Sequence, residues 1–331
     1  MSDGIGTTAQ RPGGAGALRW AGDGLRGFCI GTADLVPGVS GSTVAVLLGV
    51  YGRLLAAVRG AAGVLASLLR GDPRGAARGL RRIDWALVIP VGAGVGVALG
   101  ALAGAVDWLL TNRAEPTAGA FGGLVCAAVV VAVRQVRTWR VRLGLLSAAV
   151  AVVSAWIFGL SATPVAEPAA IVWLGAGALG VCAMILPGIS GAFVLLIIGL
   201  YATFVDILSN RDWVPLGLLA AGALVGALLF ASLLSRLLTR YHDAVMATMV
   251  GLMLGSLRVL WPWPDGVGHL GGTGEVIGGT DLEWPARSEA LWPAVCAAAA
   301  LVLALAISRT ADRRAAGTAE EDGLLEAPRQ R

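Results

Sequence analysis

The sequence predicts an all-α polytopic membrane protein, arranged as an inverted-topology repeat with two re-entrant helical hairpins and about six transmembrane helices. Two observations lead to this prediction. Hydrophobic residues make up 56% of the chain and charged residues only 14%, whereas soluble domains contain about 25% charged residues. In addition, a Pro-Gly-x-Ser-Gly motif occurs twice, 150 positions apart, and each copy interrupts an apolar run. Paired interruptions of this kind are typical of transporters with two broken membrane helices.

The first copy of the motif lies in the apolar segment Leu25–Leu55 and the second in Ile171–Leu208. Their cores, LVPGVSGSTVAVLLGVY and ILPGISGAFVLLIIGLY, share Pro, Gly, Ser, Gly, Gly and Tyr in register without a gap. Proline lacks an N–H and glycine permits unusual dihedral angles, so each Pro-Gly pair is expected to end one half-helix. The predicted break residues are Pro37, Gly38, Pro187 and Gly188.

Six further apolar runs approach the length of about 20 residues that spans a bilayer. They are Trp85–Leu110, Ala118–Val133, Leu143–Leu160, Val214–Leu238, Ala244–Leu260 and Leu291–Ile307. With the motif segments they predict a single transmembrane domain over residues 22–308, with one repeat at about 24–160 and the other at about 171–308. Residues 1–21 lack the apolar core of a cleaved signal peptide and are expected to be a mobile N-terminus. The charged tail 309–331 is expected to be disordered.

Arginine placement predicts how the chain is oriented. All 25 basic residues are arginine, and short arginine-rich loops belong in the cytoplasm. Arginines lie on both sides of the first motif segment, which therefore enters from the cytoplasm and returns there. The loop Ser161–Pro168 has no arginine, so the second segment starts outside and returns outside. The two hairpins thus enter from opposite faces with their breaks near the midplane, and both termini are cytoplasmic.

The two breaks have the chemistry of an anion site. A serine placed as Ser40 or Ser190 can cap the half-helix that follows each break. The start of a helix exposes unpaired N–H groups and the positive end of its dipole, which attract phosphate or carboxylate. The expected phosphate-binding residues at the breaks are Ser40, Gly41, Ser42, Thr43, Ser190 and Gly191.

A structural role for the small residues is the alternative. Glycine and serine let membrane helices approach closely, and two runs outside the motifs fit that role. They are the ladder Gly92, Gly96, Gly100 and Gly104, and the pair Gly222 and Gly226. For the Pro-Gly-x-Ser-Gly motifs, the presence of two copies in register favours a substrate site.

Two charged residues are further candidates. Asp34 lies three residues before Pro37 in an apolar leg, and a carboxylate at membrane depth is costly enough to indicate function. It is a candidate for proton coupling; alternatively it binds Arg26 or a backbone amide near the interface. Arg258, near the external end of its span, either receives phosphate at the outer mouth or extends to the lipid headgroups. The four cysteines and two histidines lack metal-ligand spacing, so neither a metal nor a cofactor is expected.

The segments GTADLVPGVSGSTVAVLLGVYGRLL and AMILPGISGAFVLLIIGLY resemble the two signature segments of the bacterial polyprenyl-phosphate translocases. MVGLMLGSLRVLWPW, at Met249–Trp263, resembles the late signature of that family. The resemblance runs from about Gly24 to about Ile307. Two positions depart from the common family motifs, because Ser42 replaces a glycine of PGVSGGT and Ala192 replaces a serine of PGISGSF.

The resemblance implies a transporter and not an enzyme. Its substrate would be undecaprenyl phosphate, the C55 lipid carrier of cell-wall precursors, returned from the outer to the inner leaflet of the cytoplasmic membrane. A proton or sodium gradient would drive the transport.

Two other functions are alternatives to lipid transport. A small-anion or ion transporter could use the same paired helix ends. A lipid-phosphate phosphatase needs a catalytic histidine beside a nucleophile and a basic cluster, and His242 and His269 lie in poor settings for that chemistry. The net charge of +4 is explained by topology, so the expected partner is the bilayer and not nucleic acid. The sequence does not predict the oligomeric state.

Overall fold

The computed structural model describes residues 14–36, 39–160, 165, 167–261, 263 and 282–326. Within these ranges every regular element is a helix. The first half contains α1 (Gly14–Asp34), α2 (Gly41–Leu47), α3 (Tyr51–Leu69), α4 (Pro73–Arg82), α5 (Trp85–Asn112), α6 (Ala114–Gln135) and α7 (Val141–Ile157). The second half contains α8 (Ala170–Ile185), α9 (Gly191–Ile197), α10 (Tyr201–Ser209), α11 (Trp213–Arg240), α12 (His242–Ser256) and α13 (Arg287–Glu326).

The all-helical membrane architecture is confirmed. By length and composition, α3, α5, α6, α11 and a stretch of α13 can each cross a bilayer, and the bent pair α9–α10 has the form of either a broken sixth span or a re-entrant loop. All six runs expected outside the motifs are helical over nearly their whole length. Side chains over much of the surface are apolar and exposed, as in Ile171 at 73% and Val214 at 75%. The chain is therefore a multi-pass membrane protein.

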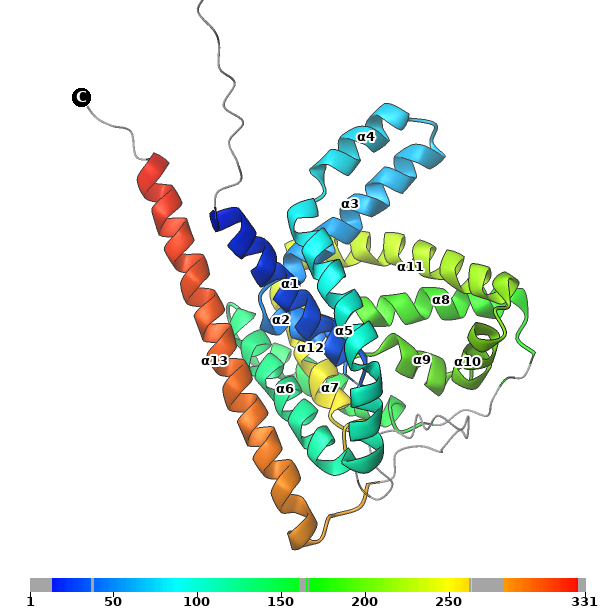
Figure 1. The fold of residues 1–331 in the computed structure, drawn as a ribbon, viewed down its shortest axis with the longest axis vertical. Coiled ribbons are helices and arrows are strands. Elements are labelled where there is room, and N and C mark those ends of the chain that lie inside the picture. The colour runs from blue at the N-terminus through cyan, green and yellow to red at the C-terminus, as the bar shows by residue number, and fades with distance from the viewer. Residues whose placement is uncertain are drawn as a thin grey trace, which may run out of the picture.

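The boundaries differ from expectation in three places. Helix α1 begins at Gly14, within the stretch 1–21 that was expected to be mobile. The second leg of the first motif does not end near Leu55 but continues as α3 to Leu69, because the chain stays apolar. It then turns into α4, and the two helices form an antiparallel hairpin that projects from one end of the molecule (Figure 1). The last helix, α13, runs past Ile307 to Glu326, where a disordered tail was expected; its alanine-, glutamate- and arginine-rich composition favours helix. Residues 1–13, Pro37, Gly38, His269 and 327–331 lie outside the described residues.

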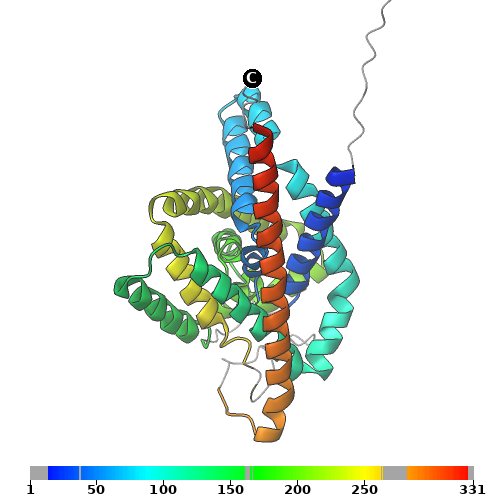
Figure 2. The same ribbon diagram turned by 90° about the vertical axis from the view of Figure 1, so that its left-hand side faces the viewer.

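Helices at matching places in the two repeats pack in matching pairs. In the first repeat α1 packs along α5, and in the second α8 packs along α11. The remaining long helices pair across the repeats, with α6 against α13 and α12 against α7. Figure 2 shows α13 running along one side of the molecule. Each repeat thus packs one of its helices against the last helix of the other repeat, as expected for an internal two-fold repeat. The inversion of one repeat relative to the other across the membrane stays a prediction.

Glycines bring the helices of the first pair into backbone contact. A Cβ added to Gly27 of α1 would overlap the carbonyl oxygen of Val91 on α5. In return, a Cβ on Gly94 of α5 would overlap the carbonyl oxygen of Gly24. Small residues that remove this obstacle are the usual basis of tight packing between membrane helices.

The second pair repeats this arrangement at equivalent positions. A Cβ on Gly177 of α8 would overlap the carbonyl oxygen of Leu219, and one on Gly222 of α11 would overlap that of Leu174. Gly226 adds a third approach, 2.7 Å from its added Cβ to the Cα of Ala178. The expected packing role of the Gly222 and Gly226 pair is confirmed.

The expected packing role of the other ladder is wrong for this chain. Nothing lies within 4 Å of a Cβ placed on Gly92, Gly96, Gly100 or Gly104. Gly94, which does pack, is two residues from its neighbours in that ladder. Two residues correspond to a rotation of roughly 200° around a helix, so the ladder faces away from α1.

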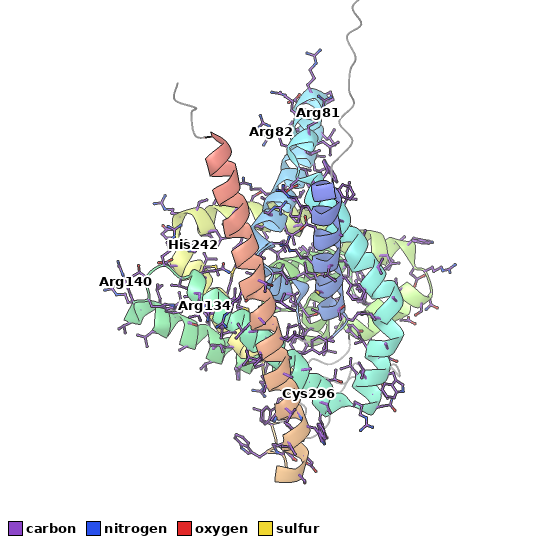
Figure 3. The ribbon with its side chains drawn as sticks, turned by 60° about the vertical axis from the view of Figure 1, so that its left-hand side comes forward. Arg81, Arg82, Arg134, Arg140, His242 and Cys296 are labelled. Carbon is purple, nitrogen blue, oxygen red and sulfur yellow. The ribbon has the colours of Figure 1, made fainter. Side chains whose placement is uncertain are left out.

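The centre of the molecule is formed by short and buried helices. In α2 every residue except Ser42 is buried, and α12 buries most of its length against α6 and α7. Figure 3 shows Arg81 and Arg82 on the projecting hairpin, toward the opposite end of the molecule from Cys296 on α13. The interrupted motifs therefore lie in the interior, and this arginine cluster lies at one end.

Substitution of Gly94 tests the helix pairing. We expect Gly94→Leu to lower the free energy of unfolding by about 1–3 kcal/mol or more, since the side chain has no room against α1. Gly96→Leu, two residues away on the open face, should change it by less than about 0.5 kcal/mol. Thermal unfolding of both purified variants in detergent measures the difference. Equal stabilities would contradict the α1–α5 contact.

Candidate functional site

Each motif copy is a long helix, a seven-residue helix and another helix, joined by two breaks. The first break separates α1 from α2 and α8 from α9, and in the second copy it contains Pro187 and Gly188. Gly188 has φ of 96°, a backbone conformation that glycine adopts at little cost. The helix interruption thus occurs where the sequence predicted it.

A second break in each copy was missed by the sequence analysis. Gly49 separates α2 from α3 with φ of 71°, and Gly199 separates α9 from α10 with φ of 74°. The axes of α9 and α10 differ by 115°. The signal was present, because these glycines recur in register two residues before a tyrosine, but each lies in an apolar run that continues the helical pattern.

The two copies of the motif bind each other directly. The N–H of Gly188 donates to Oγ1 of Thr43 at 2.8 Å, and Oγ of Ser42 donates to the carbonyl of Leu186 at 3.0 Å. The hydroxyl of Tyr51 donates to the carbonyl of Ile185 at 3.0 Å. All three bonds join a hydroxyl of the first copy to the backbone at the end of α8 or just after it, with Thr43 as an acceptor and Ser42 and Tyr51 as donors. The expected meeting of the two breaks is therefore present.

Asp34 holds the start of α2. The N–H of Gly41 donates to its Oδ1 at 2.6 Å. A Cβ added to Gly41 would lie 2.5 Å from Oδ2 of Asp34, so the close approach requires glycine. Arg26 instead pairs with Asp23, so of the two structural alternatives for Asp34 the backbone amide is the one observed. The first N–H of α2 is therefore already bonded to a side-chain carboxyl group of the same motif copy.

Met184 has the corresponding place in the second copy. A Cβ added to Gly191, which begins α9, would lie 2.6 Å from Cγ of Met184. The side chain seven residues before the opening glycine thus covers it in both copies, as a carboxylate in one and as a thioether in the other.

The two serines flank the short helices but do not cap them through their side chains. Neither Ser40 nor Ser190 makes a side-chain capping bond. The hydroxyl of Ser40, which is 2% exposed, lies 2.7 Å from that of Ser42, while the N–H of Thr43 bonds the carbonyl of Ser40 at 2.9 Å. The side-chain capping expected from the sequence is therefore wrong for both serines, and the hydroxyl of Ser40 pairs with that of Ser42 instead.

A cavity of ≈ 180 Å³ opens beside the first copy, between α1, α2, α3 and α8. Its polar lining consists of Asp34, Ser42 and Tyr51, and the rest is apolar or glycine. Asp34 is exposed, so its carboxylate is both bonded to α2 and accessible from this cavity. The sequence analysis identified two of these polar residues and missed Tyr51, although its recurrence as Tyr201 marked the position.

Arg258 lies elsewhere. It follows α12 and its guanidinium packs over Gly159, just after α7. The neighbouring residues Phe158 and Val259 join Phe193 of α9 in an apolar cluster, in which the rings of Phe158 and Phe193 meet edge to face at 5.4 Å. Arg258 is thus on the side of the second copy and does not line the cavity that contains Asp34.

Comparisons with known proteins agree on one family. Residues 30–271 match the undecaprenyl phosphate translocase-like family. The chain is 33% identical over 245 residues to the polyprenyl-phosphate transporter of Vibrio cholerae, covering 73% of this chain and 77% of that protein. It is 29% identical over 256 residues to the polyprenyl-phosphate transporter of Staphylococcus aureus, covering 72% and 85%. No solved structure matches the chain.

Substitution of Thr43 tests the contact between the motifs. Thr43→Val keeps the shape of the side chain but leaves the N–H of Gly188 unpaired in a buried site, which costs about 1–3 kcal/mol. We expect a corresponding loss in the free energy of unfolding. Thr43→Ser keeps the hydroxyl and should retain most of the stability. Denaturation in detergent compares the two, and a Thr43→Val protein as stable as the wild type would show that this bond does not join the copies.

Proposed function

Because the chain belongs to the undecaprenyl phosphate translocase-like family, we propose that it transports undecaprenyl phosphate across the cytoplasmic membrane. The lipid is returned from the outer to the inner leaflet for envelope synthesis. The name shared by the two relatives, polyprenyl-phosphate transporter, supports this substrate. No bond of the lipid is made or broken, so the protein acts as a translocase and not as an enzyme.

The observation that carries the proposal is the direct contact between the two interrupted motifs. A lipid phosphate must take its charge through hydrocarbon, where an unpartnered ion is costly. Two helix breaks joined by the Thr43–Gly188 and Ser42–Leu186 bonds gather polar groups in the interior of a membrane protein. The serines and glycines around these breaks are the proposed phosphate cradle, and the Asp34 cavity is its access from the bilayer.

Asp34 is the proposed coupling group. Of the described residues that line the cavity, it alone has a carboxyl group, and none has an amine, imidazole or guanidinium group; its neighbours there are Gly41 and Ser42 of α2, Tyr51 of α3 and Met184 of α8. An ionised Asp34 would repel a phosphate and compete with it for the N–H of Gly41. A proton on Asp34 removes the repulsion and weakens its hold on that N–H. Lipid phosphate and a proton would therefore enter together.

Arg258 is proposed to meet the phosphate first. It lies near the end of α12 next to the second motif copy, away from Asp34. On the predicted topology this end faces the outside, because the arginine-rich hairpin of α3 and α4 lies in the cytoplasm. The lipid would move from Arg258 to the cradle and leave toward the inner leaflet. The reciprocal helix pairs support an inverted repeat that exposes the cradle to each side in turn.

Transport by an Asp34 variant tests the function and its coupling. In proteoliposomes with undecaprenyl phosphate, we expect wild-type protein to move the lipid between leaflets faster when a pH gradient is applied. Asp34→Asn can still accept the Gly41 bond but cannot take up a proton. It should fold normally, no longer respond to the pH gradient, and transport the lipid at least about tenfold more slowly, the equivalent of about 1.4 kcal/mol.

Asp107→Asn is the matched control, since Asp107 is an exposed carboxylate of α5 that does not line the cavity. It should transport at the wild-type rate. Flux of soluble anions that lipid phosphate does not inhibit, in vesicles where the lipid stays in its leaflet, would replace the proposal with the small-anion transporter.

Neutralisation of Arg258 tests the outer contact. We expect Arg258→Gln to raise the KM for undecaprenyl phosphate by about tenfold, the equivalent of 1.4 kcal/mol, while saturating lipid restores much of the rate. Arg113→Gln, at an exposed arginine between α5 and α6, should leave KM unchanged. An unchanged KM in Arg258→Gln would assign this arginine to the headgroup region only.

A further inference from the structure

We propose that the cavity between α1, α2, α3 and α8 holds the first isoprene unit of the lipid, the unit that is joined to the phosphate. The inference rests on the proposed function and deepens it, because it names the part of the substrate that is bound outside the phosphate cradle. The residues assigned to this subsite are Ile30, Leu54, Leu55, Val58, Met184 and Ile185.

The lining of the cavity matches an amphiphile. Its polar groups, Asp34, Ser42 and Tyr51, belong to the first motif copy or adjoin it, and its other walls are apolar. The hydroxyls of Ser42 and Tyr51 already donate to the backbone at the C-terminal end of α8. An inorganic anion in this space would therefore face mostly hydrocarbon. A lipid whose phosphate is held by the neighbouring cradle can instead place its first isoprene unit against the apolar wall of the cavity.

The size of the cavity limits how much of the isoprenoid chain of the lipid it can hold. A cavity of about 150 Å³ in another protein binds benzene, which has six carbons. The volume of ≈ 180 Å³ here is therefore large enough for one five-carbon isoprene unit and too small for most of a polyprenyl chain. The rest of a polyprenyl chain must lie outside, in the bilayer.

The rim of the cavity offers such an exit. Met184 on α8 is 49% exposed, and Leu54 and Val58, one turn apart on α3, are only partly buried. The remaining isoprene units can leave the cavity past these side chains into the bilayer.

The second motif copy has different residues at the positions that line this cavity in the first copy. At the positions 150 residues later, Asp34 is replaced by Met184, Ser42 by Ala192, Leu54 by Phe204 and Val58 by Leu208. Polar groups are lost and two wall residues become larger. The isoprene subsite is therefore assigned to the first copy, and the equivalent helix α10 supplies matched control positions.

Photoaffinity labelling of the full chain in proteoliposomes tests the assignment. Two analogues of undecaprenyl phosphate are compared, with a diazirine on the first isoprene unit or on the last. We expect the first-unit probe to label α3 near Leu54 and Val58 or α8 near Met184, and the last-unit probe to label these sites at least about tenfold less. Excess unlabelled undecaprenyl phosphate should suppress the labelling.

A substitution that fills the cavity is the second part of the test. Val58→Trp should abolish the first-unit labelling and raise the KM for the lipid, whereas Leu208→Trp, at the equivalent exposed position of α10, should change neither. If Val58→Trp does not fold, the labelling pattern of the wild type still decides. Labelling of other helices by the first-unit probe, in vesicles that transport the lipid, would overturn the subsite and leave the proposed function intact. Absence of both labelling and transport would overturn the proposed function as well.

Discussion

A break in a membrane helix exposes backbone N–H and C=O groups that lipid cannot satisfy, and this constraint organises the interior of the protein. The two breaks lie against each other, and the side chains that bond them all come from the first copy. Hydroxyls of Ser42, Thr43 and Tyr51 bond the backbone at Ile185, Leu186 and Gly188. The backbone of the second break is thus bonded by side chains of the first copy, so this part of the polar centre needs both repeats.

Helix packing brings the breaks together. Glycines at equivalent positions bring α1 onto α5 and α8 onto α11 at backbone distance, which sets where α1 and α8 end. The exchange of α6 and α12, each packed against the last helix of the other repeat, then ties the two halves into one unit. An error of one residue in either glycine contact would move a break by about 1.5 Å along its helix axis, enough to lose the hydrogen bonds between the copies.

The two motif copies share the positions of their helix breaks but differ in their side chains. Gly41 and Gly191 both begin a short helix beneath the side chain seven residues earlier, yet that side chain is Asp34 in one copy and Met184 in the other. The polar side chains that join the copies all belong to the first. Such a division suits a substrate with a charged head and a hydrocarbon chain. One copy can provide acid, hydroxyls and cavity, while the other provides mainly its backbone.

The sequence alone determined the membrane class, the helical runs, the positions of the Pro-Gly breaks and the pairing of the two motifs, because hydropathy and in-register repetition are local properties of the chain. It also indicated Asp34, since a carboxylate in an apolar run is costly wherever it lies. Only the tertiary structure decided which glycines pack, that Asp34 holds the N–H of Gly41, and that Tyr51 and Arg258 lie on different sides. These outcomes depend on how helices rotate about their axes and which backbone groups meet, and side-chain contacts between distant segments decide both.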